Sequence, residues 1–268
     1  MYQFKISESE FIAFREFIYE HAGINLSNEK KTLVTSRLSK RLRHFSLETF
    51  SEYFELMMAS GKDGERQVVI DLLTTNETYF FREPKHFSFL EEQVLSKWKG
   101  GKTFKVWSAA SSSGEEAYSI AMLLDDKLGN HPWEIFGSDI NSHVLKTAQQ
   151  GHYVQDRIDG IPEKYLKKYC LKGTQEYQGT LLIDKKLRQK VSFSAVNLKQ
   201  PLGSIGPFDI IFLRNVLIYF DLETKQKIIK QLVEKMLPHG YLFIGHSESL
   251  KGVHDGLETV APTVYRKI

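Results

Sequence analysis

The chain has 268 residues, with 36 Lys or Arg against 33 Asp or Glu for a formal charge of +3, and 41% of its residues are hydrophobic. This length and hydrophobic content support a substantial buried core and exclude a disordered chain. The one cysteine, Cys170, excludes an internal disulfide and a zinc site with two or more cysteine ligands. We expect a cytoplasmic protein without a signal peptide or direct membrane insertion. Charges interrupt the amino-terminal segment, and no apolar run approaches the ~18 residues of a membrane span.

Apolar residues recur at helical spacing from residue 8 to about residue 73. Breaks at Gly23, around Ser46 and at residues 61–64 divide this stretch into four segments. It contains little of the alternation that is typical of β-strands. The sequence therefore predicts a small all-α domain over residues 1–75.

After residue 100, short β-rich runs alternate with longer amphipathic segments. The runs predict buried strands at residues 104–108, 133–138, 191–195, 209–213 and 241–245. Segments such as 115–128 and 224–237 predict the intervening helices. This alternation predicts an α/β domain with a mostly parallel sheet and helices on both faces.

Two further segments depart from the alternation. Residues 257–260 and 264–267, on either side of Pro262, predict a hairpin that closes one edge of the sheet. Residues 171–190 predict a small insertion of short strands.

A loop of small residues, Ser108 to Gly114, joins the first predicted strand to a helix that begins with Glu115 and Glu116. Ligands of open parallel sheets bind at such a position. The loop lacks the G-x-G-x-x-G spacing of dinucleotide sites, and a pyrophosphate would meet two negative charges there. These features disfavour an NAD-dependent dehydrogenase and favour a ligand with positive charge. The alternative is that both glutamates only complement the helix dipole.

The second predicted strand ends at Asp139, 25 positions after Gly114. A carboxylate at this strand tip can accept hydrogen bonds from both hydroxyls of a ribose. Taken alone, Asp139 would more often cap the helix that starts near Asn141. Together with the small-residue loop, the ribose interpretation is the better one. An adenosine ligand with a cationic centre and no phosphates is S-adenosylmethionine.

Several motifs, in their order and spacing, resemble those of one family. They are TNETYFFRE (75–83), VWSAA (106–110), SGEE (113–116), SDI (138–140), VNL (196–198), RNVLIYF (214–220) and GHSE (245–248). The chain resembles the CheR family, chemoreceptor glutamate methyltransferases that add methyl groups to glutamate side chains of bacterial chemotaxis receptors. One departure is Ala117, where the family commonly has Pro. Pro at the start of a helix is replaceable, so this difference puts little in doubt.

The resemblance implies a Rossmann-like S-adenosylmethionine methyltransferase domain over residues 76–268, with a β-subdomain insertion at about residues 171–190. It implies a protein-glutamate O-methyltransferase that makes glutamate methyl esters and S-adenosylhomocysteine. The implied partner is the cytoplasmic helical domain of methyl-accepting chemotaxis receptors. The alternative, a catalytically inactive regulatory protein of the same fold, would lack one or more pocket residues, and none of the matched positions is missing.

Carried over by position, the resemblance implies a set of residues around the cofactor: Asn76, Thr78, Arg82, Glu116, Asp139, Asn197, Leu198, Arg214 and Asn215. Glu116 would hold the amino group, Asp139 the ribose, and Asn197 with Leu198 the adenine. Arg82 and Tyr219 would be the catalytic residues at the reacting end. Without the resemblance, Arg82 would be interpreted as a surface residue and Tyr219 as core, whereas Arg214 follows an apolar run at a strand tip and favours function by itself. No metal site is predicted.

Residues 30–43 contain six basic side chains and no acidic one. We expect Arg37, Lys40, Arg41 and Arg43 to dock an acidic helical substrate, because helical spacing places several of them beside an apolar stripe. The alternative is a solvated helix face. Basic residues also suit phosphates, but the sequence contains no nucleic-acid-binding motif, so we expect no nucleic acid partner.

Overall fold

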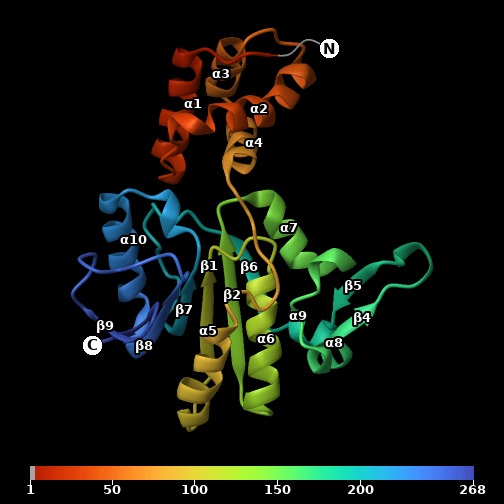
Figure 1. Ribbon diagram of the computed structural model, residues 1–268, viewed down its shortest axis with the longest axis vertical. Helices are drawn as coiled ribbons and strands as arrows, with labels where there is room; N and C mark the ends of the chain where they lie inside the picture. The colour runs from red at the N-terminus through yellow and green to blue at the C-terminus, as the bar shows by residue number, and fades with distance from the viewer. Residues whose placement is uncertain (1–3) are drawn as a thin grey trace.

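The computed structural model describes residues 4–268 and shows a helical domain joined to an α/β domain (Figure 1). The helical domain contains α1 (Glu8–Ala22), α2 (Lys31–Phe45), α3 (Phe50–Met58) and α4 (Asp63–Leu73). The predicted all-α character is confirmed, and residues 1–3 of the predicted domain lie outside the described residues. No helix in residues 4–268 has the length and apolar character needed to cross a bilayer.

Local sequence explains where these helices begin and end. Ser7 caps α1 and Thr49 caps α3, each in a capping box with a glutamate three residues later. α1 ends at Gly23, whose φ of 75° suits glycine, and α2 ends at Ser46, which also has a left-handed backbone. Phe14 packs against Phe50 and Tyr53 and so joins α1 to α3.

The α/β domain contains one large sheet with the order β6-β2-β1-β7-β8-β10-β9. Its strands are β1 (Phe104–Ala109), β2 (Trp133–Asp139), β6 (Val191–Ala195), β7 (Phe208–Leu213), β8 (Met236–Ile244), β9 (Leu257–Ala261) and β10 (Val264–Lys267). Strands β6 through β8 pair in parallel, whereas β8, β10 and β9 pair antiparallel. The predicted parallel strands and the carboxyl-terminal hairpin are confirmed.

Both faces of the sheet are covered. The helices beside the large sheet include α5 (Pro84–Phe89), α6 (Glu115–Leu128), α7 (Ser142–Gln150) and α10 (Leu222–Glu234). Successive strand residues point to opposite faces, so Val106 packs in a cluster with α5 and α6 while Trp107 packs in a cluster with α10. The second cluster continues into the helical domain, which therefore shares a core with this face of the sheet.

A separate small sheet corrects the predicted insertion at 171–190. It consists of β3 (His152–Val154), β5 (Thr180–Ile183) and β4 (Cys170–Lys172), in that order and antiparallel, and lies to one side of the large sheet (Figure 1). The insertion thus begins about twenty residues earlier than predicted and includes α8 (Glu163–Tyr169), while α9 (Lys185–Arg188) occupies its predicted end. A three-residue strand such as β3 is too short to show alternation, and it forms only because distant β5 pairs with it.

Short helical turns complete the chain: η1 (Asn28–Lys30), the π-helical η2 (Leu90–Val94), η3 (Leu95–Lys97), η4 (Gln155–Arg157), η5 (Gln175–Tyr177) and η6 (Leu217–Tyr219). The chain runs from β1 outward to β2 and β6, then crosses back to β7 on the other side of β1. This reversal opens a crevice at the carboxyl ends of β1 and β7, where a doubly wound sheet binds its ligand.

Candidate active site

A cavity of about 440 Å³ lies at the carboxyl ends of β1, β2, β6 and β7. This volume falls in the range of small-molecule sites. Every residue predicted to hold the cofactor lines it, and so does Tyr219: Asn76, Thr78, Arg82, Glu116, Asp139, Asn197, Leu198, Arg214, Asn215 and Tyr219. Sequence reasoning missed one wall. The α1–α2 linker, including Ile24, Leu26 and Lys30, also lines the cavity, so the helical domain helps to enclose it.

The loop after β1 forms one wall because its residues are small. Ser112 has a φ of 48° and Gly114 a φ of 94°. A Cβ at Gly114 would lie 2.9 Å from the Ala148 Cβ and 3.0 Å from the Tyr153 hydroxyl, so only glycine fits between α6 and α7. The Ser112 hydroxyl donates to the Asn76 carbonyl, which ties this loop to the segment that joins the two domains.

Asp139 is held at the tip of β2 by backbone N–H groups. Its Oδ2 accepts from the Ser112 amide at 2.8 Å and its Oδ1 from the Asn141 amide at 3.0 Å. Asn141, not Asp139, caps α7, since its side chain accepts from the amides of His143 and Val144. The helix-cap interpretation of Asp139 is therefore wrong. Burial raises the pKa of Asp139, and the backbone donors oppose that rise while they fix the carboxylate at the cavity wall.

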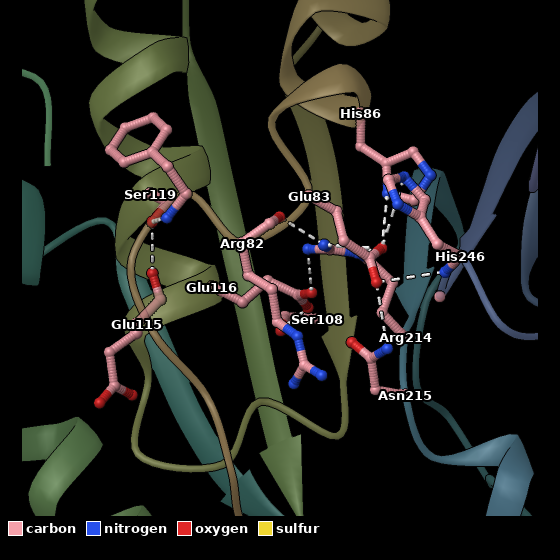
Figure 2. A network of polar contacts seen from close by, with 12 residues as sticks. Arg82, Glu83, His86, Ser108, Glu115, Glu116, Ser119, Arg214, Asn215 and His246 are labelled. Carbon is pink, nitrogen blue, oxygen red and sulfur yellow. Dashed lines mark hydrogen bonds and ion pairs between the residues drawn. The ribbon is translucent and has the colours of Figure 1, made fainter. Parts of the chain in front are cut away.

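The two glutamates that open α6 point in different directions (Figure 2). Glu115 is fully buried and accepts from Arg157 and from the Ser113 hydroxyl, both at 2.7 Å. Glu116 lines the cavity and accepts from the Ser108 hydroxyl at 2.6 Å. Consecutive helical residues lie about 100° apart, so only one of the pair can face the cavity. The structure assigns that position to Glu116 alone.

Arg214, with a side chain only 2% exposed, lies between two carboxylates. Its Nη1 donates to Glu116 Oε2 at 2.9 Å and its Nη2 to Glu83 Oε2 at 3.0 Å, while Nη2 also donates to the Arg82 carbonyl (Figure 2). Arg214 thus extends from the tip of β7 into the crevice, as predicted from its position in the sequence.

Glu83 is a site residue to which the sequence analysis assigned no role. Besides Arg214, it accepts from Asn215 Nδ2 and from the His246 amide, both at 3.1 Å. Burial alone would raise its pKa, but Arg214 and these donors hold the pKa of Glu83 at about 2. The signal in the sequence was slight: an acidic residue directly before Pro84, which begins α5.

Glu248 was also missed. It is buried and accepts from the backbone amides of Gly245, Asn215 and Ile218 at 2.6, 3.0 and 3.3 Å. Burial raises its pKa, and the amide donors oppose the rise. Through these bonds, the turn after β8 fixes the loop after β7 that carries Tyr219.

Arg82 and Tyr219, the predicted catalytic residues, are both half-buried at the cavity. The Arg82 guanidinium donates to the Glu77 carbonyl at 2.8 Å and lies over the Tyr79 ring. In Figure 2, it points away from Glu83. The Tyr219 carbonyl accepts from the Asn25 amide at 2.8 Å, which joins the loop after β7 to the linker that encloses the cavity.

Asn197 and Leu198, predicted to frame an adenine, follow β6 and line the cavity. The Asn197 side chain donates to the His21 carbonyl at 2.6 Å, so it also fixes the end of α1. Leu198 is buried in the apolar cluster that extends into the helical domain. The two residues therefore combine a cavity-facing position with contacts between the domains.

The four predicted docking residues do not form one exposed face. Arg37 donates to the carbonyls of Leu72 and Thr74 at the end of α4, and Arg41 forms a bidentate pair with Glu65. Lys40 and Arg43 are exposed. Arg37 and Arg41 were expected on an exposed docking face, but both side chains bond to α4 or to the residue that follows it. Helical spacing gives the relative positions of residues on α2, but it does not tell which side of α2 packs against a neighbouring helix.

One group of side chains could in principle offer metal ligands. Among residues 4–268, atoms of Glu83, His86 and His246 lie within 4.8 Å of one another. The Glu83 carboxylate already accepts from the guanidinium of Arg214, so a divalent ion would lie against a buried cation. We therefore assign no metal to this group.

Comparison with known proteins shows the family of the chain. Residues 9–74 match the family described as CheR methyltransferase, all-alpha domain, and residues 76–266 match CheR methyltransferase, SAM binding domain. The chain is 39% identical over 263 residues to a chemotaxis protein methyltransferase of Escherichia coli (strain K12), which covers 97% of this chain and 91% of that protein.

Two further relatives cover similar lengths. Chemotaxis protein methyltransferase 2 of Pseudomonas aeruginosa is 39% identical over 266 residues, with 98% of this chain and 94% of that protein covered. A chemotaxis protein methyltransferase of Borreliella burgdorferi is 37% identical over 275 residues, with 98% and 95% covered. The chain therefore belongs to the CheR family of S-adenosylmethionine-dependent methyltransferases.

Proposed function

We propose that this protein methylates glutamate side-chain carboxylates in the cytoplasmic helical domain of chemotaxis receptors, and that it acts in the cytoplasm. The products are glutamate methyl esters and S-adenosylhomocysteine. The supporting observation is that a single cavity is lined by all the predicted cofactor residues, Arg82 among them, and by Tyr219. The names of the full-length relatives, chemotaxis protein methyltransferases, support the assignment to receptor adaptation.

The cavity suits the cofactor by its donor set. The Asp139 oxygens, oriented by two backbone amides, can accept from ribose hydroxyls, and Glu116 can accept from an ammonium group. Leu198 offers an apolar surface to a base beside the amide of Asn197. When bound, S-adenosylmethionine supplies an electrophilic methyl group on a sulfonium.

The remaining work of the chain is positioning and desolvation. A substrate glutamate with a pKa of about 4.3 is ionised at neutral pH, so no general base is needed. Arg82, half-buried at the cavity, can orient the incoming carboxylate through its guanidinium donors. Tyr219 also lines the cavity, and the α1–α2 linker encloses it and helps to exclude water.

The test is incubation of the protein with S-adenosylmethionine carrying a labelled methyl group and with receptor-containing membranes. We expect label in the receptor band that base treatment releases, because carboxyl esters hydrolyse in base. Base-stable label would contradict glutamate esterification. Arg82→Ala should lower the rate of labelling about 100-fold while calorimetry still detects cofactor binding. Rates close to those of the unmodified protein would refute the role of Arg82.

A further inference from the structure

The charged side chains that line the cavity balance one another, and Glu83 adds a negative charge behind them by pairing with a lining cation. The lining contains three cationic and three anionic side chains: Lys30, Arg82 and Arg214, with Glu77, Glu116 and Asp139. This shell therefore has no net formal charge at neutral pH. Glu83 is not part of the lining, but it accepts from Arg214 at 3.0 Å, directly behind the shell.

Glu83 and Glu116 share a single guanidinium. Both carboxylates are largely buried, and Arg214 is 2% exposed, so solvent screens their charges weakly. If Arg214 paired with Glu116 alone, the pair would be neutral. With Glu83 as a second partner, the cluster of Glu83, Arg214 and Glu116 has a net charge of −1. Nearby His86 does not offset this charge at neutral pH, because burial holds the pKa of His86 at about 4.

We propose that Glu83 gives this cluster its negative charge and thereby raises the affinity for S-adenosylmethionine relative to that for S-adenosylhomocysteine. The cofactor carries an ammonium, a sulfonium and a carboxylate, for a net charge of +1. Loss of the methyl group removes the sulfonium charge and leaves a neutral product. The ammonium and the carboxylate are common to both ligands, so their interactions with the cluster cancel in the ratio of the two affinities. The sulfonium is present only in the cofactor, so the negative charge from Glu83 stabilises the bound cofactor relative to the product and favours product release after transfer.

The proposal depends on cofactor binding at this cavity and is independent of which protein accepts the methyl group. A purely structural role for Glu83 is the competing explanation, since it also bonds to Asn215 and to the His246 amide. A structural role would weaken the binding of both ligands alike. An electrostatic role would change the ratio of their affinities.

The experiment measures that ratio by calorimetry with purified S-adenosylmethionine and S-adenosylhomocysteine. Glu83→Gln keeps an oxygen acceptor and removes the charge. We expect its affinity for S-adenosylmethionine to fall about tenfold more than its affinity for S-adenosylhomocysteine. The matched control is Glu115→Gln, which removes a buried, ion-paired carboxylate on α6 that does not line the cavity. It should leave the ratio unchanged within about twofold.

Equal losses for both ligands in Glu83→Gln, or the same change of ratio in Glu115→Gln, would overturn the proposal. Glu83→Asp provides a second test, which holds even if the Gln variant does not fold. It keeps the charge, so the ratio should stay within about twofold of the unmodified protein whatever happens to the two affinities. A ratio that falls about tenfold in Glu83→Asp would also overturn the proposal.

Discussion

Two arginines, the half-buried Arg41 of the helical domain and the buried Arg214 of the α/β domain, form opposite kinds of ion cluster. In the helical domain, Arg41 pairs one to one with Glu65 through bonds of 2.7 and 2.8 Å, and Tyr53 donates to the same carboxylate. In the α/β domain, Arg214 serves two carboxylates, and one of them, Glu116, lines the cavity. We call the first cluster the closed pair, because its charges cancel and none of its members lines the cavity, so it serves only to hold the helices together. We call the second, formed by Glu83, Arg214 and Glu116, the open cluster, because it has a net charge of −1 beside the cavity, where this charge can act on a ligand.

The largest effect should come from breaking the open cluster. Arg214→Leu leaves two carboxylates buried near each other without a cation, so we expect the free energy of unfolding to fall by about 3–5 kcal/mol and cofactor binding to be lost. Urea denaturation and calorimetry measure the two effects. Stability equal to that of the unmodified protein would show that Arg214 does not neutralise these carboxylates.

Breaking the closed pair should lower the stability of the protein without changing its affinity for the cofactor. Arg41→Leu leaves Glu65 with only the Tyr53 donor, so the free energy of unfolding should fall by about 3 kcal/mol. The affinity for cofactor should not change, because Arg41 does not line the cavity. Denaturation and calorimetry test this, with the exposed Arg43→Leu as the control for stability. A loss of cofactor affinity would contradict the division between the two clusters.

Acid should lower the stability of the folded protein through His86, which lies beside Glu83. Burial and then the nearby Arg214 charge hold the pKa of His86 at about 4, below its usual 6.5. The unfolded chain therefore binds more protons than the folded protein between these values. The stability that neutral His86 contributes is present above pH 6.5 and is lost as the pH falls through 4. His86→Phe should remove about 2 kcal/mol of the pH dependence of unfolding between pH 6.5 and 4.5. An unchanged slope would refute this.

Asp139 differs from the carboxylates of both clusters, because backbone amides rather than an arginine hold it in place. Asp139→Ala removes the proposed acceptor for the ribose hydroxyls and should lower cofactor affinity about 20-fold. Calorimetry measures this change, with circular dichroism as the check that the variant still folds. Unchanged affinity would refute the proposed ribose contact.

The smallest effect concerns Lys40 and Arg43, the two exposed residues of α2 among those predicted to dock the substrate. Reversal of both Lys40 and Arg43 to Glu should slow receptor labelling about tenfold at low salt, less at high salt, with cofactor affinity unchanged. The control is Lys62→Glu, an exposed charge of the same domain that does not lie on α2. If the control slows labelling as much as the double variant, the docking role of this face is wrong.

The sequence by itself determined the type and order of the main elements. The periodicity of apolar residues switches from helical to strand-like after residue 100, and capping residues such as Ser7 and Gly23 mark helix ends. These signals are local, since they depend on neighbours within a few positions. The motifs also placed several predicted cofactor residues, among them Asp139, Asn197 and Arg214, at or just after the ends of strands, where a parallel sheet brings them together.

Only the tertiary structure decided how charged side chains are partnered. Glu83 meets Arg214 across 131 positions of sequence, and Glu115 turns to Arg157 while Glu116 faces the cavity. Which side of α2 packs on α4 likewise decided that Arg41 is paired and Lys40 exposed. Spacing along a helix gives relative angles, but the direction that becomes buried depends on which distant element packs there. The charge that the cavity presents is therefore a property of the fold, and the residue types alone do not determine it.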